Sequence, residues 1–308
     1  MNINKGIFMS GMVVALLSLP CHAQTKDGGI SADMLKEIQQ SQKLTTADKA
    51  LFNAVASNSI DNLAQNYANQ GALDTYFSVE TKSQNITDQK QSGRCWMFSG
   101  FNVIRSNFAN RTDSLRVDLS HAYLFFWDQL EKSNLFLQGV IDCASKPMDD
   151  VRVQFFFKSP LNDGGTFCGV SDLVDKYGLV PAEVMPETFS AENTSKATSL
   201  IKSKLREFGL KLRDMANGGK SAKEINAEKT KMLGEIYRML ALTIGEPVKE
   251  FTYAFKNKDG RTVTEAKKFT PKSFAAEMLG GKAIGGSFIM VMNDPRREYY
   301  KTYVILLS

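Results

Sequence analysis

The sequence predicts an α+β fold in which a long helical part precedes a part that contains strands. Helical spacing of apolar residues dominates from about residue 31 to residue 242. Beyond it, short strand-like stretches flank Asp259-Gly260, a dipeptide typical of a β-hairpin turn. With 308 residues, 43% of them hydrophobic and 23% charged, the chain can bury a large core in one or two domains.

The first 23 residues predict an export signal. Lys5 precedes an apolar run over residues 12–19, and Cys21 and Ala23 are small residues of the kind that signal peptidase prefers before its cleavage point. Lipidation of Cys21 is disfavoured because Pro20 precedes it. The run is too short to span a membrane, and no later segment could do so. We therefore expect cleavage after Ala23 and a secreted or periplasmic mature protein.

Charge and cysteine content favour neither nucleic acid nor metal as a partner. The net charge of +5 is spread along the chain without a Lys/Arg block. After cleavage the cysteines are Cys95, Cys143 and Cys168, and His121 is the single histidine, a set without zinc-site spacing. An odd number of cysteines leaves at least one thiol unpaired. Cys143 and Cys168 could form a disulfide or lie apart on buried helix faces. No cofactor is expected.

The helical part contains several segments with recognisable ends. Residues 31–66 read as helical, with Thr46 as a possible N-cap. A polar loop over residues 81–93 leads into a buried helix that begins at or near Cys95. Further helices are expected at 120–143, capped by Ser120, and at 166–177, ended by Gly178.

A helical hairpin and then a strand-containing region follow. Two Lys/Glu-rich amphipathic helices, 194–215 and 221–242, are joined by a glycine-containing turn, and Ser221 with Glu224 forms a capping box. This hairpin is expected to be inserted on the outside of the core. Thr270-Pro271 opens one more helix, and strands are expected at residues 251–255, 262–264, 287–291 and 299–307.

Cys95 is the candidate nucleophile. A cysteine acts as a nucleophile through its thiolate, which the first turn of a helix stabilises by its free amides and dipole. Gly93 just before it allows close approach of backbone and substrate, and the Gln89 side chain could donate to an oxyanion formed when the thiolate attacks a carbonyl. A cysteine that begins an aromatic helix can equally be a buried small hydrophobic residue.

The surrounding motif resembles the active-site segment of papain-like cysteine peptidases, most closely the bleomycin hydrolase and aminopeptidase C family. It reads DQKQSGRCWMFS over residues 88–99. Further matching segments extend the likeness from about residue 66 to residue 301: LSHAYLFFWD (119–128), NDGG (162–165), Glu187, KLREF (204–208) and NDPR (293–296).

The resemblance implies a papain-like fold and a cysteine aminopeptidase that acts on peptide N-termini. It implies that Cys95 is the nucleophile, that Gln89 is the oxyanion donor, and that Gly164, Gly165 and Trp96 border the substrate cleft. It also implies a homo-oligomer, a hexamer in the family, built in part by the helical insertion. The expected segments are 1–23 (signal), 24–190 (extension and helical half), 191–250 (insertion) and 251–308 (start of the β-rich half).

The sequence departs from the family at the general base. The family uses a late histidine and an asparagine, whereas the mature chain has only His121, which belongs to a helix start that is structural in the family. We therefore expect a chain that is shortened at its C-terminal end, with little hydrolytic activity of its own. A non-catalytic protein that binds peptides or serves assembly is the alternative, and thiol redox chemistry at Cys95 is disfavoured by the lack of a Cys-x-x-Cys pair.

Overall fold

The computed structural model describes residues 29–69, 71, 76–78, 80–81, 85–112, 115–284 and 293–301. The chain divides into two compact units, residues 1–77 and 78–308. The predicted export signal lies outside the described residues. Among those residues, no helix combines the length and apolar character needed to cross a bilayer.

The first unit contains short helices. They are α1 (Ala32–Ser41), α2 (Thr46–Ser57), α3 (Ile60–Leu63) and a 3-10 turn, η1 (Tyr67–Asn69). The expectation of Thr46 as an N-cap is wrong by one residue. Thr45 caps α2, because its hydroxyl accepts from the Asp48 amide while the Asp48 carboxylate accepts from the Thr45 amide at 2.8 Å.

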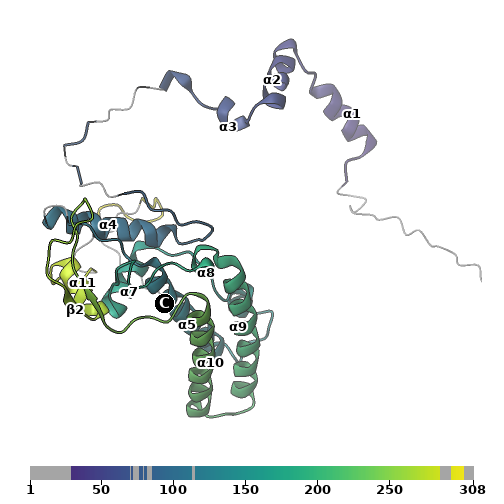
Figure 1. Cartoon of the computed structure of the whole chain (residues 1–308). Coiled ribbons are helices and arrows are strands. Elements are labelled where there is room, and N and C mark those ends of the chain that lie inside the picture. Colours follow the sequence, from purple (N-terminus) through teal and green to yellow (C-terminus); the bar gives the residue numbers. More distant parts are fainter. Residues whose placement is uncertain are drawn as a thin grey trace, which may run out of the picture. The chain divides into compact units, whose positions relative to one another are not determined.

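The second unit confirms the predicted helices and adds two (Figure 1). Ser120 caps the helix that follows it, and Gly178, with φ at +85°, ends another. Neither α6 nor α8 was predicted, because both are too short to show a helical periodicity in the sequence. The helices of this unit are α4 (Cys95–Arg111), α5 (His121–Asp142), α6 (Val151–Lys158), α7 (Phe167–Tyr177), α8 (Phe189–Glu192), α9 (Thr194–Asn217), α10 (Ala222–Thr243) and α11 (Pro271–Leu279).

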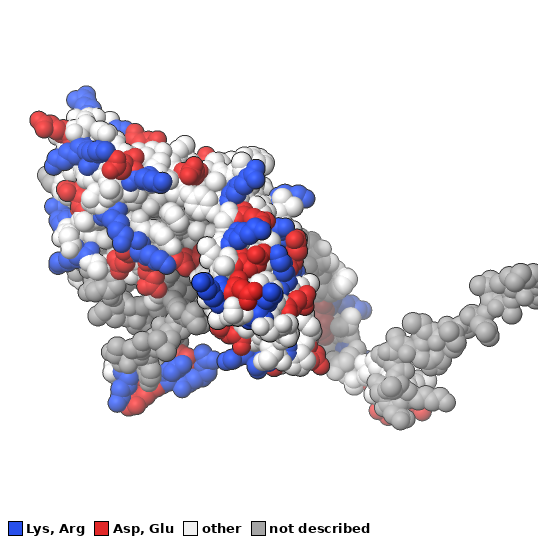
Figure 2. Space-filling model, turned by 90° about the horizontal axis from the view of Figure 1, so that it is seen from below, with Lys and Arg blue, Asp and Glu red and all other residues white. Residues whose placement is uncertain are grey.

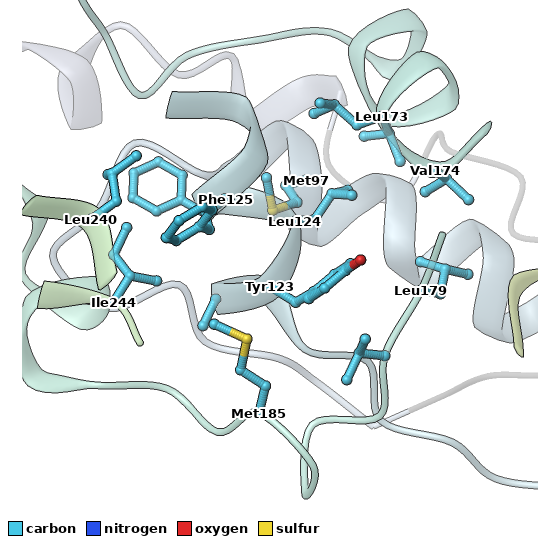
Figure 3. Close-up of a cluster of buried hydrophobic side chains, with 14 of the residues drawn as sticks. Met97, Tyr123, Leu124, Phe125, Leu173, Val174, Leu179, Met185, Leu240 and Ile244 are labelled. Carbon is cyan, nitrogen blue, oxygen red and sulfur yellow. The ribbon is translucent and has the colours of Figure 1, made fainter. Parts of the chain in front are cut away.

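The core of this unit is assembled around α5, which contacts α6, α7, α9 and α10. Figure 3 shows part of the buried cluster where side chains of several helices meet. Burial of these large apolar side chains is the main source of the fold's stability. The labelled members are Met97 from α4, Tyr123, Leu124 and Phe125 from α5, Leu173 and Val174 from α7, Leu240 from α10, and Leu179, Met185 and Ile244.

The α9–α10 hairpin is confirmed, including the Ser221–Glu224 capping box (Figure 1). The two helices pack on each other and on α5. Arg213 anchors the hairpin, since its buried guanidinium donates to the Cys143 carbonyl at 2.8 Å. Charged groups of both signs are interspersed on the face shown in Figure 2, in agreement with the even spread of charge along the sequence.

The strand-containing region differs in register from the expectation. β1 (Phe251–Tyr253) pairs antiparallel with β2 (Lys267–Phe269), so the second arm of the hairpin is not at residues 262–264. There, Thr262 makes only an isolated bridge to Lys256, because residues 257–261 close a tight turn with Gly260 at φ +77°. The predicted strand 287–291 lies outside the described residues, as does most of 299–307, and residues 299–300 form a turn.

Candidate active site

Cys95 is the first residue of α4, and its thiol is exposed. The three residues that follow are buried, with exposed fractions of 9% for Trp96, 0% for Met97 and 8% for Phe98. The first turn of the helix is therefore fixed in the core while the thiol faces solvent. The alternative of a buried Cys95 is wrong. Cys143 fits that description instead, since its buried thiol donates to the Gly139 carbonyl at 2.5 Å.

The loop before Cys95 is held in one conformation by its own side chains. The Gln89 amide nitrogen donates to the Ser92 carbonyl at 2.5 Å, and the Ser92 hydroxyl donates back to the Gln89 carbonyl at 2.6 Å. Lys90 has a φ of +54°, a left-handed conformation that costs free energy in a residue other than glycine. Asp88 supports it by accepting from the Lys90 amide at 2.8 Å. Strained backbone of this kind is concentrated at functional sites.

Arg94, directly before the nucleophile candidate, forms a buried ion pair. Its side chain is 1% exposed, and it donates to Glu187 at 2.8 Å and to the Ser92 hydroxyl at 3.0 Å. The other Glu187 oxygen accepts from the Ala122 amide in the first turn of α5 at 2.8 Å. The pair thus joins the start of α4 to the start of α5. This ion pair was not predicted from the sequence. Glu187 was named among the segments that resemble the family, but no role was assigned to Arg94.

Trp96 connects α4 to the loop of residues 162–165, here called the NDGG loop. Its indole nitrogen donates to the Asp163 carbonyl at 2.7 Å. A Cβ on Gly165 would lie 2.6 Å from Trp96 ring carbons, so the loop can lie against the ring only with glycine at this position. Gly164 and Gly165 are themselves exposed. Trp96 therefore supports the loop from inside the protein, and most of its surface is covered.

Asp163 holds the NDGG loop beside the Cys95 segment. Its carboxylate accepts from the Gly93 amide at 3.3 Å, from the Thr198 hydroxyl at 3.2 Å, and from the Thr194 hydroxyl. A Cβ on Gly93 would come within 2.8 Å of the Asp163 Cβ, so close approach requires this glycine. The structure therefore brings together the predicted Cys95 and NDGG segments, and it adds Asp163, which the sequence did not single out.

His121 is buried in an apolar environment. Its ring stacks on Phe98 with 3.6 Å between centroids, and its Nε2 atom has no hydrogen-bond partner among the described residues. Burial, with the nearby positive charges of Arg94 and Arg105, lowers the pKa of His121 to about 3. The imidazole is neutral at physiological pH, as expected for a structural histidine.

The remaining cysteines do not form a disulfide. Cys143 at the end of α5 and Cys168 in α7 are both free, so of the two alternatives the unpaired one holds. Within the described part of the chain, no cluster of three or more histidine, cysteine or acidic residues has the arrangement of a metal site.

Comparison with known proteins places these features in a family. The model of the peptidase C1-like family matches residues 29–307. Aminopeptidase C of Lactobacillus delbrueckii subsp. lactis is 37% identical over 90% of this chain and 61% of its own length, and human bleomycin hydrolase is 34% identical over 74% and 51%. The crystal structure of PepW from Lactobacillus rhamnosis is 36% identical, with a TM-score of 0.76, over 82% of this chain and 57% of that chain.

These matches agree with the arrangement of the site. The match to the solved structure supports the α+β, papain-like fold. The chain spans about three fifths of the length of aminopeptidase C and about half of bleomycin hydrolase. The chain belongs to the peptidase C1-like family, as a papain-like member of the bleomycin hydrolase and aminopeptidase C group.

Proposed function

We propose that this chain provides the nucleophile and one wall of the peptide cleft of a cysteine aminopeptidase. One observation carries the proposal: the exposed Cys95 thiol begins a buried helix and is connected through Trp96 to the NDGG loop. An exposed thiol beside a fixed loop with two exposed glycines suits attack on a peptide whose backbone lies against that loop. The names of the relatives support peptides as the substrate class.

The chemistry assigned to Cys95 is acyl transfer. The sulfur adds to a peptide carbonyl carbon, and the resulting oxyanion takes a hydrogen bond from Gln89 or a backbone amide. The carbon–nitrogen bond then breaks, the amine leaves with a proton, and water hydrolyses the thioester to release the acid and restore the thiol. To reach the oxyanion, the Gln89 amide has to turn its second N–H outward, since it already donates to Ser92.

A general base is needed for turnover, and His121 does not provide it. Its Nε2 atom is buried and its ring is stacked on Phe98, and its low pKa makes it a weak proton acceptor. His22 is the other histidine of the 308 residues and lies in the predicted export signal. Removal of one member of a catalytic triad lowers the rate by several orders of magnitude. We propose that the 308 residues by themselves hydrolyse peptides slowly or not at all.

The alternative function is peptide binding or assembly without hydrolysis. The burial of His121 favours this alternative, since the one histidine among the described residues is not placed to act as the base. The α9–α10 hairpin, which projects from the core in Figure 1, is the element that we propose for contacts in a homo-oligomer. Sedimentation of the purified chain tests assembly, and a species that remains monomeric at high concentration would contradict it.

Selective alkylation tests the proposed site. The purified mature chain is treated separately with iodoacetamide and with a dipeptidyl vinyl sulfone that has a free amino terminus, and the modified cysteines are identified by peptide mass mapping. We expect the peptide reagent to modify Cys95 at least tenfold faster than Cys168, which is partly exposed and serves as the internal control. The Cys95→Ala variant should show no rapid modification. Equal reaction of Cys95 and Cys168 with the peptide reagent would contradict the proposal.

A turnover assay separates the enzyme from the binding protein. Release of aminocoumarin from aminoacyl-coumarin substrates is measured for the wild type and the Cys95→Ala variant. If the two proteins release aminocoumarin at the same rate and the peptide reagent still labels Cys95 selectively, the peptide-binding function without hydrolysis is supported. Turnover that depends on Cys95 supports the enzymatic function and requires a base other than His121. Activity retained in the His121→Phe variant would confirm that another group acts as the base.

We also propose that the protein is exported, with cleavage after Ala23. The apolar run and the small residues at positions 21 and 23 support this, and the family match begins beyond the proposed cleavage point, at residue 29. N-terminal sequencing of the protein recovered from an expressing bacterium tests it. We expect a protein outside the cytoplasm whose N-terminal residue is Gln24. A protein in the cytoplasm that still begins at Met1 would contradict export.

A further inference from the structure

We propose that Lys132, oriented by the buried Asp128, is a positioning residue that sets the NDGG loop for peptide binding. This inference rests on the proposed function and adds to it a group outside the predicted site. Lys132 and Asp128 are one turn apart on α5, and Lys132 contacts the loop. They form an ion pair of 2.8 Å, with side chains exposed by 22% and 7% respectively.

The Lys132 ammonium group is saturated by this arrangement. An ammonium group has three N–H donors, and three acceptors surround it. They are an Asp128 carboxylate oxygen at 2.8 Å and the carbonyls of Asn162 at 3.1 Å and Gly164 at 2.6 Å. Two of the three donors therefore go to backbone atoms of one short loop. Hydrogen bonds from a charged donor are about twice as strong as neutral ones.

Two other side chains complete the hold on the loop. Gln129 donates to the Asn162 carbonyl at 3.1 Å and to Asp128 at 2.9 Å. Trp96 donates to the Asp163 carbonyl, and the Lys132 ammonium lies 5.4 Å from the centre of the Trp96 ring. Three successive carbonyls, those of residues 162, 163 and 164, thus all point at donors from α4 and α5.

The direction of these carbonyls determines where the backbone N–H groups of the loop point. In a planar trans peptide the N–H points opposite to the C=O. Because the three carbonyls face the helices, the N–H groups of Asp163, Gly164 and Gly165 face away from them. The outer edge of the loop therefore presents backbone donors next to two exposed glycines, as required to pair with a peptide backbone. Lys132 contributes to binding through this orientation and needs no contact with the peptide.

The role of Lys132 differs from general stabilisation of the fold. Lys176 offers a matched comparison, since it pairs with Glu131, another carboxylate of α5, but does not contact the NDGG loop. Replacement of either lysine by methionine removes one ammonium–carboxylate pair at α5. Only the replacement of Lys132 also releases loop carbonyls.

The test compares two reagents on the same thiol. The rate of Cys95 modification by the dipeptidyl vinyl sulfone is divided by its rate with iodoacetamide, which is too small to need the loop. We expect Lys132→Met to lower this ratio about tenfold, the factor that corresponds to loss of one charged hydrogen bond. We expect Asp128→Asn, which removes the charge that orients Lys132, to lower it about threefold. Lys176→Met should retain the wild-type ratio, and iodoacetamide should react with all four proteins at similar rates.

The outcomes separate this inference from the proposed function. If the peptide reagent modifies Cys95 and Cys168 of the wild type at equal rates, the proposed function itself is contradicted. If the wild type is modified selectively at Cys95, and folded Lys132→Met and Asp128→Asn keep the wild-type ratio of the two rates, only the inference about Lys132 is overturned. If Lys132→Met does not fold, the nearly isosteric Asp128→Asn decides alone. A drop in Lys176→Met equal to that in Lys132→Met would also overturn it, since the effect would then be general.

Discussion

The imidazole of His121 lies flat on the ring of Phe98, with 3.6 Å between centroids and 9° between planes. Phe98 is one turn after Cys95 on α4, so this contact joins the start of α5 to the first turn of the nucleophile helix. His121 therefore acts as an aromatic packing residue under the site. A second contact, a ring centroid distance of 4.8 Å to Phe101, reinforces this role.

His121 is expected to make the protein sensitive to acid. Its pKa is about 3 when folded and about 6.5 when unfolded, so the unfolded state binds more protons between these values and stability falls as pH decreases through that range. From pH 7 to pH 5 the loss attributable to His121 is about 2 kcal/mol. We expect His121→Phe to remove it, as measured by urea unfolding at both pH values. Equal pH dependence in the variant and the wild type would show that His121 is not buried as a neutral ring.

Asp128 should have the opposite effect. Burial raises its pKa to about 6, although Lys132 and hydrogen bonds partly oppose the shift and Asp163 adds to it. The folded state then binds the extra proton between about pH 3.8 and pH 6, so this group favours the folded state increasingly as pH falls. From pH 7 to pH 5 the free energy of unfolding of the wild type should gain about 1 kcal/mol relative to Asp128→Asn. A difference between the two proteins that does not change with pH would contradict a raised pKa.

The Arg94–Glu187 pair should be required for stability. Glu187→Gln leaves a guanidinium group that is 1% exposed without its charged partner, and loss of one partner of a buried pair costs about 3–5 kcal/mol. Glu187 is itself 26% exposed, so we expect the lower end, about 3 kcal/mol, by chemical unfolding.

A matched control for this variant exists at the surface. Glu250 pairs with Lys268, and both side chains are more than half exposed. Glu250→Gln should change stability by less than about 1 kcal/mol. Similar losses in the two variants would mean that burial of Arg94 does not set the cost.

Gly165→Ala should damage the site locally. The new methyl group would lie 2.6 Å from Trp96 ring carbons, so the NDGG loop or the ring has to move. Overpacking of this kind costs about 1–3 kcal/mol, and the Cys95 reaction with the dipeptidyl vinyl sulfone should slow while its reaction with iodoacetamide is unchanged. Gly164→Ala is the control for stability, since a Cβ there meets nothing closer than 3.5 Å. Equal stability of the two variants would contradict the close packing at Gly165.

Local sequence signals determined most of the helices and their ends. Ser120, Ser221 and Thr270 cap helices through hydrogen bonds to amides three residues away, so a short stretch of sequence contains the information needed. The α4 helix was predictable from its apolar spacing, and the motif around it identified Cys95 and the family. The short α6 and the register of β1 with β2 were not predictable, because non-local packing decides them.

The sequence by itself thus determined the family, the helical framework and the identity of the nucleophile candidate. The resemblance already assigned His121 a structural role, but only the tertiary structure showed that Cys95 is exposed while the His121 ring is stacked on Phe98, because both residues begin aromatic helices and look alike in local sequence. It also decided that Asp163 and Lys132 hold the NDGG loop, through contacts between residues 30 to 70 positions apart. Such contacts depend on how helices pack in three dimensions, and no local periodicity records them.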